Sequence, residues 1–360
     1  MEKRAFLLGG HFLLLFLFFG ISCQQENSRA SQNYFETFIE ARPFIYLENI
    51  GTEFKISRSF LQAKLFHITD DLITYLIDSE RHRVLEIDMR GHLKNIIGGP
   101  GQRENDLYYP VAVTANDKVL AVVNDSGREI KIFDRSGKFL KLFSKDDIHF
   151  QPFILSHKNN LIVPIRKATA PLEEKNKSYL FSLLDQDFAE IRHFGQVIKC
   201  STPINHIHFN LIELTVGRKA VYGSFINLPI IFAYDLNSSR EIFWIDLSQS
   251  EIPEISSLTE KIKQLDADTP MKQKAAGNFR VIRFNRGLSF YANKIFYLTD
   301  EIFLIFNLQG NLTGRIKIML NKNIDLTPAI DSFTILPSGK IYGLAKHPES
   351  KQPFIFEAKI

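Results

Sequence analysis

The sequence lacks most of the features that would identify an activity directly. Among 360 residues only two are cysteine, and the formal net charge at pH 7 is +4. So small a charge on a chain of this length gives no field that would attract nucleic acid. The G-x-S-x-G, H-E-x-x-H and Walker motifs are all missing, so no common catalytic signature is present. Present instead are 45% hydrophobic residues, including 32 phenylalanines, a composition that favours β-sheet.

Residues 1–22 have the order of parts that is typical of a secretory signal. Lys3 and Arg4 precede an apolar run, and small residues then lead into Cys23. This order resembles a bacterial lipoprotein signal, in which the cysteine is lipidated and becomes the new N-terminus, although Gly20 stands where leucine is usual. An uncleaved membrane anchor is the alternative. We therefore predict an exported protein of the Gram-negative cell envelope, tethered to a lipid membrane, at the outer membrane or on the periplasmic face.

Residues 23–34 are polar and predict a flexible tether, and residues 35–360 form the predicted folded domain. If Cys23 carries lipid, Cys200 has no partner for a disulfide within the chain. We expect Cys200 to be a small buried residue, and the fold to depend on its hydrophobic core.

Two weak signals alternate along the predicted domain. The first is a polar turn between two short β-rich runs, at Asp70-Asp71, Asn116-Asp117, Asn159-Asn160, Gly217, Asn293 and Gly339. The second is an apolar run that ends in an acidic or amide residue, at Asp88, Asp134, Asp185, Asp235, Asn307 and Glu357. Each pair predicts four antiparallel strands, and a repeat of about 40–50 residues is typical of β-propeller blades. Packing such sheets face to face buries their apolar surfaces.

The predicted fold is therefore an all-β, six-bladed β-propeller. The sixth unit reaches the end of the chain without a fourth strand, whereas residues 35–50 form a spare β-rich segment. We predict that residues 42–47 pair with the last blade and close the ring, which removes an exposed edge. Residues 250–280, between blades four and five, are poor in apolar residues and predict either short helices on a loop or a disordered insert.

Residues 97–143 carry a more specific pattern. A Gly-Pro-Gly loop at 99–101 is followed by Pro110, a "DSG" turn at 125–127 and a strand that ends at Asp134. This pattern resembles the repeat of NHL and TolB-like six-bladed propellers, and residues 78–91 echo it one blade earlier. The resemblance covers about two blades. It implies the propeller fold and the cellular location of a lipoprotein, and it implies no activity.

In this fold the turns between second and third strands share one rim with the blade-to-blade crossovers, and such loops often carry binding residues. The candidates on this rim are Asp78, Arg81, His82, Arg103, Asp106, Asp125 and Arg128. Turn chemistry alone also explains the two "DS" turns, because Asp and Ser side chains bond nearby backbone N–H groups. The glycines at 98, 99 and 101 are not followed by a helix or by Gly-Lys-Ser/Thr, so they do not indicate a phosphate loop.

His206 and His208 are weak metal candidates, because alternate residues of a strand face the same side but stand far apart for chelation. Two function hypotheses remain. The favoured one is a binding scaffold without cofactor, whose rim recognises an envelope protein, a peptide or a glycan. The alternative is a metal-dependent propeller enzyme of the lactonase or lyase type, with Ca²⁺ or Zn²⁺ in an axial channel. Metal analysis of the purified protein discriminates between them.

Overall fold

The computed structural model describes residues 36–47, 50, 66–144, 148–151, 154–155, 160–167, 179–185, 187–198, 209–268 and 283–360. All of them belong to the compact unit Tyr34–Ile360. The predicted signal, Cys23 and its tether lie outside the described residues, as do Cys200, His206 and His208.

Four sheets follow one another along the chain, and we call them blades one to four. Each consists of antiparallel strands that are hydrogen-bonded in chain order, except that the first two short strands of blade three both pair with its third. Blade one contains β2 (Phe66–Ile68), β3 (Thr74–Asp78), β4 (Arg83–Ile87) and β5 (Leu93–Gly98). Blade two contains β6 (Ala112–Ala115), β7 (Val119–Asn124), β8 (Glu129–Asp134) and β9 (Phe139–Ser144). Blade three contains β10 (Ile148–Phe150), β11 (Ile154–Leu155), β12 (Leu161–Lys167), β13 (Tyr179–Leu184) and β14 (Glu190–Gln196). Blade four contains β15 (Ile212–Val216), β16 (Ala220–Phe225), β17 (Ile230–Asp235) and β18 (Glu241–Asp246).

The remaining strands form a single nine-stranded sheet. One half contains β19 (Gly287–Tyr291), β20 (Lys294–Leu298), β21 (Phe303–Phe306) and β22 (Leu312–Leu320), with the short β23 (Ile324–Asp325) beside β22. The other half contains β24 (Ile330–Ile335), β25 (Lys340–Lys346), β26 (Pro353–Lys359) and the N-terminal β1 (Glu36–Tyr46). Each half repeats the four-strand order of a blade. The sequence predicted two separate sheets here, but β1 joins them.

The strand β1 has two partners. Its first part runs parallel to β22, from Glu36 opposite Arg315 to Ala41 opposite Leu320. Its second part runs antiparallel to β26, up to Tyr46 opposite Phe354. The predicted pairing of the N-terminal segment with the last sheet is thereby confirmed. Eleven residues of β1 and nine of β22 make both strands long enough to connect the two halves.

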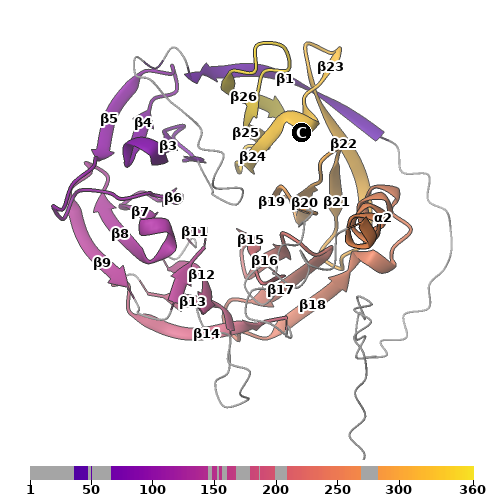
Figure 1. Ribbon diagram of the computed structural model, residues 1–360, viewed down its shortest axis with the longest axis horizontal. Helices are drawn as coiled ribbons and strands as arrows, with labels where there is room; N and C mark the ends of the chain where they lie inside the picture. Colours follow the sequence, from indigo (N-terminus) through magenta and orange to yellow (C-terminus); the bar gives the residue numbers. More distant parts are fainter. Residues whose placement is uncertain are drawn as a thin grey trace, which may run out of the picture. The chain divides into compact units, whose positions relative to one another are not determined.

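The first strands of the sheets, with β11 standing for blade three, contact one another in a closed cycle, in the order β2, β6, β11, β15, β19, β24 and back to β2. Figure 1 shows β6, β11, β15, β19 and β24 toward the centre and β5, β9, β14 and β18 toward the outside. Apolar side chains fill the spaces between neighbouring sheets. One cluster joins Leu76 of blade one to Leu120 of blade two and Tyr342 of β25. Burial between facing sheets is the arrangement that the apolar content requires.

The acidic or amide residue after the third strand organises the turn that follows. The Oδ1 atom of Asp134 accepts hydrogen bonds from the backbone N–H groups of Ser136 and Lys138, each at 2.9 Å. The Ser136 hydroxyl, and then these backbone groups, lower the pKa of Asp134. Equivalent backbone bonds are accepted by Asp88, Asp185, Asp235 and Asn307. This repeated turn is the physical origin of the second sequence signal at five of its six positions. The sixth, Glu357, lies inside β26 and accepts hydrogen bonds from Arg42, Lys340 and Tyr342 instead.

The helix α2 (Pro253–Asp268) lies between β18 and β19, within the segment predicted as an insert. Its residues Ile255 and Leu258 are buried in a cluster with Leu304 and Phe306 of β21. Arg315 of β22 forms an ion pair with Glu254 at 3.3 Å. No helix built from the described residues is long and apolar enough to cross a membrane.

Candidate functional site

Three predicted rim segments meet beside blades one and two. They are the turn Ser79–Arg81 after β3, the turn Asp125–Gly127 after β7, and the crossover that follows β5. The crossover residues Tyr108 and Tyr109 lie between the two turns. The Tyr109 N–H donates to His82 Nδ1 at 2.9 Å, and the Asp125 N–H donates to the Tyr108 carbonyl at 2.7 Å. These bonds hold the crossover to both blades.

His82, Tyr108 and Tyr109 form what we call the aromatic cluster. The rings of His82 and Tyr108 stack with centroids 5.3 Å apart. The Tyr109 ring meets both edge-on, at 4.6 Å from His82 and 4.7 Å from Tyr108. Edge-to-face contacts of this kind are favourable because the ring edge is positive and the ring face negative. Tyr108 is nevertheless 54% exposed and Tyr109 39% exposed, so the cluster presents aromatic surface to solvent.

The backbone around this cluster is strained. His82, Tyr109, Asp125 and Ser126 all have positive φ angles, between 45° and 56°. Residues other than glycine seldom adopt this region, and each pays on the order of 1 kcal/mol to do so. Gly127 has a φ of +100°. It cannot be replaced by a larger residue without a clash, because a Cβ there would lie 2.5 Å from the Phe150 carbonyl oxygen. Strain persists only where the surroundings enforce it, and it is often found at functional sites.

Asp78 lies on the rim, but its side chain is completely buried. Its Oδ2 atom accepts a hydrogen bond from Arg83 Nε at 3.0 Å, and Arg81 Nη1 is 3.5 Å away. Its Oδ1 atom has no hydrogen-bond partner among the described residues. The structure therefore makes Asp78 an internal anchor for the turn, and Arg81 is partly exposed above it.

Asp125 and Arg128 are the predicted residues on the other side of the cluster. Arg128 Nη1 lies 3.6 Å from Asp125 Oδ2, and the Arg128 side chain is 71% exposed. An ion pair this exposed contributes little to stability, because water competes with both partners. The Arg128 guanidinium is consequently free to contact a ligand.

Arg103 and Asp106 occupy the part of the crossover that is held to blade two. Asp106 Oδ2 accepts from the Arg103 N–H at 2.8 Å, and the Asp106 carbonyl accepts from Lys131 Nζ of β8 at 2.6 Å. Asp106 thus shapes the loop, while the Arg103 side chain is exposed.

The sequence prediction missed three residues that build this site. Tyr108 and Tyr109 were predicted only as part of the crossover, although two adjacent aromatics before a proline are a visible signal. Asn124 is buried, accepts from the Tyr108 N–H at 2.8 Å and donates to Glu129 at 2.6 Å. Nothing in the sequence gives a reason to choose Asn124, because it is a single polar residue at the end of a predicted strand.

Within the described part of the chain, no group of three His, Cys, Asp or Glu side chains is placed to hold a metal ion. The two candidate histidines, His206 and His208, are outside that part, so the metal prediction stays untested.

No family model matches the chain, and no curated protein matches it either. Solved structures do match. A Bacteroides fragilis protein that is proposed to be exported has a TM-score of 0.53 at 9% identity, over 91% of this chain and 99% of that one. A luciferin-regenerating enzyme has a TM-score of 0.51 at 10% identity, over 89% and 96%. At such low identities the likeness shows the fold alone, a propeller arrangement of blades.

Proposed function

We propose that the protein is a six-bladed β-propeller that binds a partner protein of the cell envelope through the aromatic cluster. The count of six is supported by the cycle of first strands and by the two four-strand halves of the nine-stranded sheet. Export, and tethering to the membrane through lipidated Cys23, belong to the same proposal. They are supported by the signal-like N-terminus and by the likeness to a protein that is proposed to be exported.

The observation that carries the proposal is the exposure of two tyrosines on a strained and hydrogen-bonded frame. Tyr and Arg are enriched at the centres of protein interfaces, because they bring a large contact surface and polar groups together. Here Tyr108 and Tyr109 have the exposed Arg128 on one side and the partly exposed Arg81 on the other. The frame lowers the entropy that binding would otherwise cost, because the rings are already in place.

The test is site-specific photo-crosslinking of the full chain in its native cells. A photoreactive phenylalanine derivative at Tyr108 should yield a covalent adduct with one protein partner. The same derivative at Leu140, which is 49% exposed on β9, is the matched control and should yield no such adduct. The adduct should also disappear when Tyr109 is replaced by serine.

Equal labelling at both positions, or no protein adduct at Tyr108, would contradict the proposal. Binding of a purified oligosaccharide that Tyr109→Ser abolishes would assign the cluster to a glycan and likewise overturn the protein partner.

A further inference from the structure

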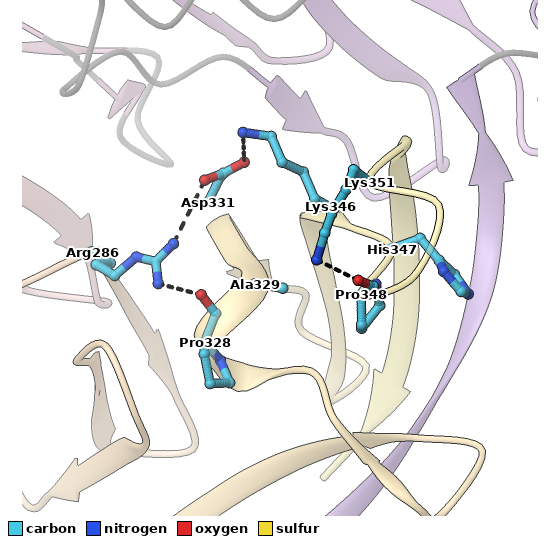
Figure 2. A pocket seen from close by; sticks show the side chains of 8 residues that line it. All are labelled: Arg286, Pro328, Ala329, Asp331, Lys346, His347, Pro348 and Lys351. Carbon is cyan, nitrogen blue, oxygen red and sulfur yellow. Dashed lines mark hydrogen bonds and ion pairs between the residues drawn. The ribbon is translucent and has the colours of Figure 1, made fainter.

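A second surface feature lies where β19 and β24 begin and β25 ends. A cleft of about 300 Å³ lies there. Figure 2 shows the residues that line it: Arg286, Pro328, Ala329, Asp331, Lys346, His347, Pro348 and Lys351. The turn between β25 and β26 supplies His347, Pro348 and Lys351. It is the counterpart in strand order of the turn between β3 and β4, which carries His82. The cleft is formed by other sheets than the aromatic cluster and shares no residue with it.

The lining carries an excess of positive charge. The lining holds three cations, Arg286, Lys346 and Lys351, and one carboxylate, Asp331. A second carboxylate, Asp300, lies beside the lining with its Oδ1 atom 3.7 Å from Arg286 Nη1, so the formal charge is +1 (three cations less two anions). Lys351 Nζ donates to the Pro348 carbonyl, a contact that does not neutralise its charge. An excess of one charge in a cleft raises the local concentration of counter-ions.

Asp331 only partly compensates for these cations. Its Oδ1 atom lies 3.6 Å from Arg286 Nη2, and its Oδ2 atom lies 3.8 Å from Lys346 Nζ. Both separations exceed those of charge-assisted hydrogen bonds. Figure 2 shows the carboxylate between the two cations. The Oδ2 atom is buried and has no hydrogen-bond partner among the residues that the structure describes. The Lys346 ammonium therefore retains donors for another acceptor.

The arginine of the lining is held in place. Arg286 is 15% exposed and donates to the Pro328 carbonyl at 2.7 Å, so its side chain is already ordered. His347 Nδ1 accepts from the N–H groups of Glu349 at 3.3 Å and Ser350 at 3.4 Å. These contacts order the turn, but Figure 2 shows the His347 ring directed away from Lys346 and Lys351, so His347 is not counted among the donors.

We propose that this cleft binds a small organic anion through its carboxylate or phosphate group, with Lys346 and Lys351 as contacts and Arg286 supplying the field beside them. Both groups are strong acceptors for ammonium donors. A volume of about 300 Å³ lies at the small end of ligand sites, so a ligand of about the size of one sugar or amino acid fits. The proposal does not depend on the aromatic cluster.

The test is calorimetric titration of the full chain in detergent at constant ionic strength. Inorganic phosphate is the probe in one arm and glucuronate in the other, with chloride as the reference. We expect saturable binding in at least one arm, and the arm that responds identifies the anionic group. Lys346→Gln/Lys351→Gln should raise the Kd at least tenfold, which corresponds to about 1.4 kcal/mol.

The matched control removes the same charge elsewhere. Lys138→Gln/Lys322→Gln changes two exposed lysines, one of them 78% exposed, and should leave the Kd unchanged. If the double variant of the cleft does not fold, Lys351→Gln alone should still weaken binding. The inference is overturned if neither probe saturates, if binding survives loss of the cleft lysines, or if the control weakens it equally.

Discussion

Glu357 is the residue at which side chains of β1, β25 and β26 meet. Its Oε1 atom accepts from Arg42 Nη2 of β1 at 2.6 Å. Its Oε2 atom accepts from the Tyr342 hydroxyl at 2.5 Å and from Lys340 Nζ at 2.9 Å. Burial by itself would raise the pKa of Glu357, but hydrogen bonds from Tyr342, Lys340 and Arg42 outweigh it and lower the pKa to about 2.

This pKa predicts a specific dependence of stability on pH. Because the folded pKa of about 2 is below the ordinary 4.5, the contribution of Glu357 is fully present above pH 4.5 and is lost as the pH falls toward 2. Glu357→Gln should lower the free energy of unfolding at neutral pH by about 2 kcal/mol. It should also flatten the loss of stability across that acid range. Urea denaturation at a series of pH values measures both effects.

Glu40→Gln is the control, because that side chain is 57% exposed and forms a long ion pair, 4.0 Å from Lys322 Nζ. A Glu357→Gln variant with the acid sensitivity of the unaltered chain would show that the carboxylate is not the linkage group.

At the scale of the element, two sheets contain the same cross-strand pair of a glycine and a phenylalanine. Gly223 of β16 lies opposite Phe232 of β17, and Gly343 of β25 lies opposite Phe356 of β26. A Cβ on Gly223 would lie 2.2 Å from the Phe232 ring, and one on Gly343 would lie 2.3 Å from the Phe356 ring. Each ring occupies the space that the glycine leaves, which lets a large third-strand residue pack across a second strand.

Gly343→Ala should therefore destabilise the protein by about 1–3 kcal/mol, because the Phe356 ring must leave its position to make room. Gly314→Ala in β22 is the matched control, because a Cβ there would meet Ile305 at 3.5 Å, an ordinary contact. Thermal unfolding of both variants provides the comparison. Equal melting temperatures would refute the packing role of Gly343.

At the scale of the whole molecule, β1 connects the two halves of the nine-stranded sheet. Ala41 is paired with Leu320 on one side and with Ala358 on the other, and it is 2% exposed. It thus lies where β1 passes from one half of the nine-stranded sheet to the other. Since the first strands also contact one another in a closed cycle, we expect unfolding to be cooperative across all sheets.

Ala41→Asp places an unpaired carboxylate in that junction and should cost at least about 3 kcal/mol. Its thermal transition should also be broader, because the two halves no longer unfold together. Phe38→Asp, three residues earlier in the same strand at a position that is 61% exposed, should have little effect. A sharp transition at an unchanged temperature for Ala41→Asp would contradict the closing role of β1.

The features predicted correctly from the sequence are those that depend on nearby residues or on counting strands. The turns at Asp88 and Asp134 are made by hydrogen bonds to groups two and four residues away, so a local pattern is sufficient to predict them. The pairing of β1 with β26 could be predicted because the sixth unit lacked a fourth strand and residues 35–50 formed a β-rich segment with no assigned sheet. The rim segments at 78–82 and 125–128 both contact the crossover at Tyr108 and Tyr109, as the order of strands leads one to expect, while their binding role stays a prediction.

Only the tertiary structure decided which rim side chains face solvent and which distant segments touch. Asp78 and Asp125 follow strands in similar turns, yet Asp78 is completely buried beneath two arginines while Asp125 is partly exposed. Tyr108 and Tyr109 gain their place from hydrogen bonds to two separate turns, and the cleft unites Arg286 with Lys346 and Lys351. Such differences arise because the same local turn is packed against different neighbours, and the neighbours are chosen by how whole sheets stack.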